Sequence, residues 1–283
     1  MKILGKGHGG VVVADSAGAV KKFYLSRAYG QSEEQHLTFL GGLQDQGFSI
    51  GCTIPRFLEA VGKGTWEIDG KTYVYCNRME RIPGVSAQLA IPDFNERQIK
   101  SLGKDLGNII FALHAQSKTY TAQWKNTFGQ EDKLLAHILK DKAGQVMREG
   151  PDKSVNARVK KAASYLQSQC ESIASENTLS HLDYSLSNTQ ASHTGHVNGL
   201  VDWGDFGLTH PALSLYQLAS RPVWPHVKRQ YEQLGGLIRE DITYAAAAIN
   251  LAWVPIICAQ LGLPLEPEET QESFEAMYAR FEA

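Results

Sequence analysis

Two polar patterns, whose aspartates Asp183 and Asp202 are 19 residues apart, restrict this chain more than any other feature of its sequence. The first is H-L-D-x-x-x-x-N over residues 181–188, and the second is D-W-G over residues 202–204. The residues between them predict a short hairpin, which returns Asp202 to the neighbourhood of Asp183 and Asn188. Two carboxylates and an amide oxygen form a hard-oxygen site suited to Mg²⁺. A carboxylate such as Asp183 can also orient a hydroxyl group and accept its proton.

A glycine-rich pattern opens the chain. Gly5, Gly7 and Gly10 match G-x-G-x-x-G, and Val12 is the apolar residue two places later. A dinucleotide-binding fingerprint must run from a strand into a helix, whereas these glycines lead into a predicted hairpin over residues 11–23. The glycines and this hairpin would form a flexible flap, in which the missing side chains let backbone N–H groups approach phosphate oxygens. The alternative is a plain glycine-rich turn.

Two adjacent lysines lie on the second strand of that hairpin. Successive strand residues point to opposite faces, so only one of Lys21 and Lys22 can face the cleft beneath the flap. We favour Lys21 because it fits the V-A-I-K spacing, and Lys22 is its competitor. The chosen ammonium needs a carboxylate, which Glu33 or Glu34 on the following helix can supply.

The secondary-structure pattern changes near Pro83-Gly84. Before it, residues 66–79 predict a second hairpin with its turn at Asp69-Gly70. Ser32 is expected to cap a helix whose first part ends at Gly41-Gly42. After the break, residues 99–114 carry apolar side chains at helical spacing. We therefore expect an α+β fold with a small antiparallel sheet followed by a mostly helical lobe.

Composition excludes several classes of protein. Lys and Arg number 28 against 30 Asp and Glu, so binding to nucleic acid mainly through phosphate contacts is not expected. The four cysteines are scattered without a C-x-x-C pair, and the N-terminus leaves no room for a signal peptide before Gly5. Residues 242–265 lack charge, but polar residues and Pro255 interrupt them, which favours a pair of buried helices over a membrane span. We expect a cytoplasmic protein with no membrane partner.

Together these patterns resemble the kinase-like phosphotransferases, most closely the aminoglycoside phosphotransferase and choline kinase group. That group typically carries H-G-D-x-x-x-x-N, a hairpin and then I-D-W-G, and the resemblance extends from Gly5 to about Ala219. It implies a two-lobed protein-kinase-like fold. Its small N-terminal lobe would be residues 1–79, its hinge residues 80–84 and its helical lobe residues 85–283.

The resemblance also implies a role for each matching residue. In the catalytic centre Asp183 would be the base, Asn188 and Asp202 would hold Mg²⁺, and Lys21 paired with Glu33 would contact the phosphates of ATP. In the hinge the Glu80 carbonyl and the Ile82 N–H would bind adenine. His181 would support the catalytic loop through hydrogen bonds, and Asp205, which begins a literal D-F-G, would play a supporting part.

Departures from the group's pattern concern the support of the catalytic loop. Leu182 replaces the usual glycine, and residues 210–214 are H-P-A-L-S where the group often has D-P-A-x-D, so Ser214 lacks the bracing carboxylate. His114 follows Leu113 on an apolar helix face and is expected to be a hydrogen-bonded core histidine.

The function implied is ATP-dependent phosphoryl transfer to a hydroxyl of a small molecule, such as an aminoglycoside, choline or a sugar-like compound. A protein kinase is disfavoured because only residues 203–209 separate Asp202 from the next predicted helix, which leaves no activation segment. A nucleotide-binding pseudokinase is disfavoured because the catalytic and metal-binding residue types are all present.

Overall fold

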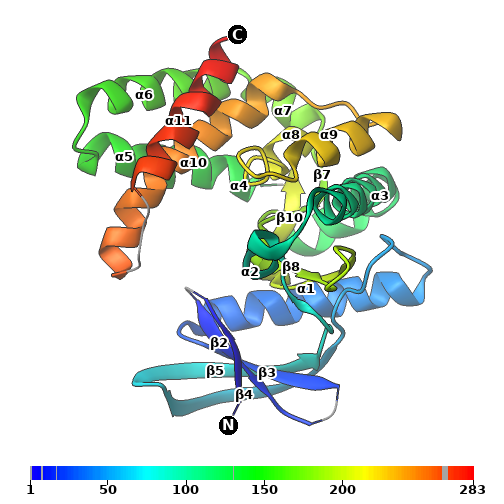
Figure 1. The fold of residues 1–283 in the computed structure, drawn as a ribbon. Coiled ribbons are helices and arrows are strands. Elements are labelled where there is room, and N and C mark those ends of the chain that lie inside the picture. The colour runs from blue at the N-terminus through cyan, green and yellow to red at the C-terminus, as the bar shows by residue number, and fades with distance from the viewer. Residues whose placement is uncertain (1, 8, 17, 130, 263–266) are drawn as a thin grey trace. The chain divides into compact units, whose positions relative to one another are not determined.

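The chain divides into two compact units, each described here by itself. The computed structural model describes residues 2–7, 9–16, 18–129, 131–262 and 267–283 (Figure 1). Unit 1 comprises Met1–Asp105 and Leu186–Phe206, and unit 2 comprises Leu106–Ser185 and Gly207–Ala283. These units differ from the lobes expected from the sequence, because residues 85–105 and 186–206 group with the N-terminal sheet. The expected hinge, residues 80–84, consequently lies inside unit 1.

Unit 1 is built on a five-stranded antiparallel sheet with the strand order β1-β2-β3-β5-β4 (Figure 1). Its strands are β1 (Ile3–Lys6), β2 (Gly10–Ala14), β3 (Ala19–Tyr24), β4 (Phe57–Ile68) and β5 (Lys71–Glu80). Helix α1 (Arg27–Asp45) follows β3. A second sheet, ordered β6-β8-β9, contains β6 (Val85–Ser86), β8 (Thr189–Ala191) and β9 (Val197–Leu200). Short helices α2 (Ala87–Ala90), η1 (Ile91–Asp93), η3 (Leu186–Asn188) and η4 (Trp203–Asp205) complete the unit, together with the start of α3 (Glu96–Phe128).

The hairpins of unit 1 confirm the predictions made from turn residues. Asp69 and Gly70 connect β4 to β5 with φ of 52° and 73°, the left-handed conformation that a tight hairpin turn of this type requires. The hairpins β2–β3 and β8–β9 also form as expected. A core cluster on the sheet contains Val11, Val13 and Phe23, so the β-branched and aromatic strand residues supply the apolar packing.

Helix α1 differs from its prediction at both ends. It begins at Arg27 after Ser26, so Ser32 lies inside the helix rather than at its N-cap. It also runs through Gly41-Gly42 to Asp45. Burial of Leu37, Leu40 and Leu43 explains this continuity, because tertiary packing outweighs the weak helix propensity of glycine.

Unit 2 is mostly helical, as predicted. After the remainder of α3 it contains α4 (Lys133–Ala136), the π-helix η2 (His137–Ala143), α5 (Gly144–Glu149), α6 (Lys153–Ser168) and α7 (Cys170–Ser175). Strands β7 (Thr178–His181) and β10 (Phe206–Thr209) form a two-stranded sheet. The last helices are α8 (Pro211–Ser214), α9 (Trp224–Gln233), α10 (Glu240–Leu261) and α11 (Pro267–Glu282). An antiparallel N-terminal sheet with a helix-rich remainder confirms the α+β class.

Helix α10 corrects the expectation of a helix pair over residues 242–265. It is one helix as far as Leu261, with Pro255 inside it, and residues 263–266 lie outside the described part of the chain. Within the described residues Glu240–Gln260 is the one helix with the length and hydropathy to cross a bilayer, a test that a core helix also passes. Residues 242–249 are buried in the unit, in agreement with a core position.

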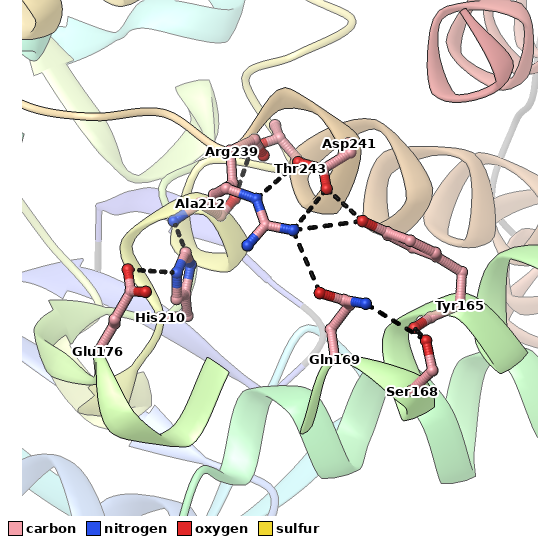
Figure 2. Close-up of polar contacts among 9 residues, drawn as sticks. All are labelled: Tyr165, Ser168, Gln169, Glu176, His210, Ala212, Arg239, Asp241 and Thr243. Carbon is pink, nitrogen blue, oxygen red and sulfur yellow. Dashed lines mark hydrogen bonds and ion pairs between the residues drawn. The ribbon is translucent and has the colours of Figure 1, made fainter. Parts of the chain in front are cut away.

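Polar contacts fix the N-terminal end of α10 within unit 2 (Figure 2). The Arg239 guanidinium donates to both carboxylate oxygens of Asp241, to Gln169 and to Tyr165, whose phenol also contacts Asp241. Thr243 donates to the Ala212 carbonyl at 2.9 Å. Helix α10 is thereby attached to both α6 and α8.

Candidate active site

A largely buried lysine, with 12% of its side chain exposed, joins two carboxylates in unit 1. Lys22 on β3 places Nζ 2.7 Å from Oε2 of Glu33 on α1 and 2.8 Å from Oδ1 of Asp202, which precedes η4. The three side chains come from positions 11 and 180 residues apart in sequence. Glu33 is almost fully buried, whereas 46% of the Asp202 side chain is exposed. One ammonium therefore bridges an inner structural carboxylate and an outer, accessible one.

The electrostatics of this cluster keep the lysine charged. Burial favours the neutral amine, but the charges and hydrogen bonds of Asp202 and Glu33 outweigh burial and hold the pKa of Lys22 above its ordinary value. The ammonium also lies 5.3 Å from the centre of the Tyr24 ring. A permanently charged donor at this place can bind anionic groups such as phosphate oxygens.

Lys21 does not take the place predicted for it, and the expected Lys21–Glu33 pair is wrong. Its Nζ lies 3.0 Å from Asp15 on the other face of the sheet, where Arg78 also contacts Asp15. There Lys21 lines a cavity of about 290 Å³ together with Phe23 and Cys76. Alternation along β3 gives the physical reason: Val12 pairs with Lys22 across the hairpin, so the face that carries Val12 also carries Lys22.

The glycine-rich segment forms the turn between β1 and β2. The Gly7 N–H donates to the Gly10 carbonyl at 2.9 Å, so this N–H is engaged within the turn. A side chain at Gly10 would collide with the Phe23 carbonyl, whereas a Cβ atom added at Gly5 or Gly7 would meet no neighbouring atom within 4 Å. Gly10 is thus required by packing, whereas Gly5 and Gly7 have space for a side chain.

The predicted hinge residues follow the end of β5. Glu80 is the last residue of β5, and the Ile82 side chain is buried against Gly199 of β9. Gly84 has φ of 118°, and a side chain there would collide with the Ala191 carbonyl. Since Asn198 also donates to the Pro83 carbonyl at 2.9 Å, this segment is fixed to the β8–β9 hairpin.

The D-W-G segment is held by its tryptophan and by α1. Trp203 is fully buried and donates through Nε1 to the Leu200 carbonyl at 2.8 Å. Ser32 donates to the Gly204 carbonyl at 3.1 Å, and His36 Nδ1 lies 3.0 Å from the Trp203 carbonyl oxygen. Asp202 itself has φ of 64°, a left-handed conformation that is uncommon outside glycine and is concentrated at functional sites.

The backbone segments of Asn188 and Asp202 lie next to each other at the open end of the β8–β9 hairpin. Thr189 pairs with Leu200, and the Val201 N–H donates to the Asn188 carbonyl at 2.9 Å. One carboxylate and one amide oxygen are too few ligands for a resident metal ion. Among the described residues, no group of three His, Cys, Asp or Glu side chains could hold a metal ion. The carboxylate and the amide fit Mg²⁺ that arrives with phosphate oxygens as its other ligands.

Unit 2 carries the remaining catalytic candidates on the segment after β7. His181 is buried, and its Nδ1 accepts a hydrogen bond from the Asp183 N–H at 3.2 Å. This bond leaves the proton of a neutral His181 on Nε2 and fixes the backbone beside Asp183. The supporting role of His181 stays a prediction, and this hydrogen bond is the contact through which His181 would act. Asp205, the other predicted supporting residue, is exposed in unit 1.

A buried hydrogen-bonded cluster lies where a bracing carboxylate was expected. His114 contacts the Tyr231 hydroxyl at 2.8 Å and the Ser180 hydroxyl at 2.5 Å, and Ser214 Oγ lies 3.4 Å away. Burial lowers the pKa of His114 to about 3, so the imidazole is neutral. Since Ser180 precedes His181 on β7, His114 supports the strand that leads to Asp183. His114 is the core histidine predicted from the sequence.

His210 replaces the first aspartate of the expected D-P-A-x-D pattern and acts as a helix cap. Its Nδ1 accepts from the Ala212 N–H at 3.1 Å, so Nε2 carries the proton that faces Glu176 at 3.3 Å (Figure 2). An acceptor at the N-cap satisfies a helix N–H that otherwise lacks a partner. This cap was not predicted, although Pro211 at the first helical position is a sequence signal for it.

Comparison with models of protein families identifies one match. The model of the phosphotransferase enzyme family matches residues 37–248, which is most of the chain. The chain belongs to the phosphotransferase enzyme family. A search of curated protein sequences finds no match for this family member.

Solved structures of aminoglycoside phosphotransferases share the fold of this family member. The GDP and kanamycin complex of APH(2")-IIia is 13% identical with a TM-score of 0.68, covering 99% of this chain and 92% of that one. The ternary complex of a thermostable APH(4)-Ia mutant with AMP-PNP and hygromycin B is 14% identical with a TM-score of 0.65, and the match covers 98% of this chain and 92% of that one. The streptomycin-ATP-APH(2")-IIa complex is 14% identical with a TM-score of 0.61, and the match covers 99% of this chain and 92% of that one. The predicted kinase-like fold is confirmed.

Proposed function

We propose that this family member transfers the γ-phosphoryl group of ATP to a hydroxyl group of a small molecule. The observation that carries the proposal is the contact of one largely buried ammonium, Lys22, with both Glu33 and Asp202 in the unit that holds the glycine-rich turn. A phosphoryl-transfer site needs a fixed cation and an accessible carboxylate next to a phosphate-binding loop.

Each residue then has a chemical task. Lys22, held by Glu33, would contact phosphate oxygens. Asp202 and Asn188 would hold Mg²⁺, which neutralises phosphate charge when it is bound. Asp183, which precedes Asn188 by five residues, would orient the acceptor hydroxyl and accept its proton.

The nucleotide is proposed to be ATP. Val12 lies on the Lys22 face of the sheet, where it offers an apolar contact for the base. The Glu80 carbonyl and the Ile82 N–H would form the hydrogen bonds to adenine. Similar structures hold either ATP or its analogue AMP-PNP, or GDP, so the comparison supports a purine nucleotide in general.

The acceptor is proposed to be a small molecule rather than a protein. The described residues between η4 and α8 comprise β10 and His210 alone, which leaves no activation segment there on which a peptide would lie. Similar structures hold kanamycin, hygromycin B or streptomycin. An aminoglycoside, choline or a sugar-like compound is therefore the proposed class. A cytoplasmic location, without a nucleic acid or membrane partner, completes the proposal.

The test is transfer of labelled phosphate from γ-labelled ATP in the presence of Mg²⁺. One panel contains aminoglycosides, choline and sugars, and a second contains proteins. We expect label on at least one small hydroxyl compound. Label on proteins alone would show a protein kinase instead, and ATP binding without transfer to either panel would show a pseudokinase.

A further inference from the structure

The Glu33 carboxylate depends on one oxygen for its orientation. Oε2 accepts from Lys22 Nζ and from the Tyr24 hydroxyl, both at 2.7 Å. Oε1 is also buried, and it has no hydrogen-bond partner among the described residues. An unsatisfied buried acceptor costs free energy, so Oε1 contributes nothing to the orientation of the carboxylate, which depends on the two hydrogen bonds to Oε2.

The phenol of Tyr24 is placed to maintain that orientation. Tyr24 lies two residues after Lys22 on β3, so both side chains project from the same face of the sheet. The hydroxyl oxygen of Tyr24 accepts a hydrogen bond from Asn77 Nδ2 at 3.3 Å. This bond directs the hydroxyl proton of Tyr24 toward Glu33. Burial and the Glu33 carboxylate raise the pKa of Tyr24 well above its ordinary value, so the phenol remains a donor.

Asn77 links this contact to the backbone of α1. It is fully buried on β5, where it pairs with Lys22 of β3, and its Nδ2 also donates to the Gly30 carbonyl at 2.7 Å. Gly30 lies one helical turn before Glu33, and a side chain at Gly30 would collide with the Tyr75 ring. The sheet therefore fixes both the Glu33 carboxylate and the helix that carries it.

We propose that Tyr24 is a positioning residue for phosphoryl transfer: its phenol keeps Glu33 oriented toward Lys22, with Asn77 orienting Tyr24. This inference rests on the proposed function. Lys22 is shared with Asp202 at a similar distance, so an ion pair alone does not decide which carboxylate holds the lysine. The neutral donor Tyr24 binds Glu33 without competing for Asp202.

The test compares two phenol deletions on neighbouring strands. Tyr24→Phe removes the bond to Glu33, and Tyr75→Phe removes an equivalent 2.6 Å bond to Glu34, which is not part of the cluster around Lys22. The two rings are 6.4 Å apart, so the substitutions are matched in site and chemistry. We expect Tyr24→Phe to lower kcat/KM for ATP about tenfold, as for a hydrogen bond to a charged group. Tyr75→Phe should stay within about twofold of wild type, and equal effects of both variants would overturn the proposal.

A double-mutant cycle separates positioning from general stability. In a Glu33→Gln background the carboxylate is already lost, so adding Tyr24→Phe should change kcat/KM by less than about twofold. A further tenfold loss in that background would show that Tyr24 acts elsewhere. Should Tyr24→Phe fail to fold, Asn77→Ser supplies the second variant. It keeps the phenol of Tyr24 and removes the Asn77 amide that donates to the phenol oxygen. A severalfold loss of kcat/KM supports the proposal, and an unchanged value contradicts it.

Structures of Tyr24→Phe and Tyr75→Phe give a measurement that is independent of activity. We expect the Lys22–Glu33 contact to open beyond 4 Å in Tyr24→Phe alone, and an intact contact would overturn the positioning role. If wild-type protein transfers no phosphate to either panel, the proposed function fails. The structural comparison still decides whether Tyr24 holds Glu33.

Discussion

The Lys22 ammonium lies 2.7 Å from the Glu33 carboxylate, although its neighbour Lys21 fits the expected sequence spacing. The register of the β2–β3 hairpin explains the difference. A four-residue turn over 15–18 would pair Ala14 with Ala19 and turn Lys21 toward the face of Val12. The structure pairs Ala14 with Val20 instead. A shift of one residue moves every side chain of a strand to the opposite face.

Substitution of the two lysines tests this register directly. We expect Lys22→Ala to lower kcat/KM for ATP about a hundredfold, because it removes a preorganised cation from the proposed phosphate site. Lys21→Ala removes only a partly exposed pair with Asp15 and should cost less than about threefold. Steady-state kinetics with varied ATP measure both values. Equal losses would contradict the assignment of the Lys22 face.

Gly84 should be sensitive to a single methyl group. Its φ of 118° and the nearby Ala191 carbonyl predict that Gly84→Ala destabilises the protein by about 1–3 kcal/mol. Gly41→Ala is the matched control, because Gly41 lies inside α1 with no atom near a Cβ position. It should stabilise the protein by up to about 1 kcal/mol. Urea unfolding measures both changes, and a Gly84→Ala variant as stable as wild type would refute the close approach.

His114 should make stability depend on pH. Its pKa is lowered to about 3 in the folded protein and returns to about 6.5 on unfolding, so the unfolded chain binds more protons between these values. The free energy of unfolding should therefore fall as the pH is lowered from about 6.5 toward 3. Denaturation at several pH values should give a shallower dependence for His114→Gln than for wild type. Parallel curves would show that His114 does not contribute.

The sequence predicted the elements that local chemistry determines. Asp69-Gly70 specifies a hairpin because both residues tolerate positive φ, and this turn forms between β4 and β5. The H-L-D-x-x-x-x-N and D-W-G patterns predicted the β8–β9 hairpin, which brings Asn188 next to the segment of Asp202. These features depend on a few adjacent residues.

The sequence did not predict features that depend on tertiary contacts. Helix α1 continues through Gly41-Gly42 because leucines before and after them are buried, which helix propensity alone does not reveal. The Tyr24–Glu33 and His114–Ser180 contacts join residues 9 and 66 positions apart, and no local pattern indicates either pair. The roles of Asp183, Asn188 and Asp202 remain predictions that kinetics must test.

The most direct test of the proposed phosphoryl transfer is the Asp183→Ala variant, assayed for turnover and ATP binding in parallel. Loss of the proposed base should lower kcat at least about a hundredfold. The dissociation constant for ATP should remain nearly unchanged, because Lys22 and the glycine-rich turn are intact. A variant that retains a tenth of the wild-type kcat would contradict the account.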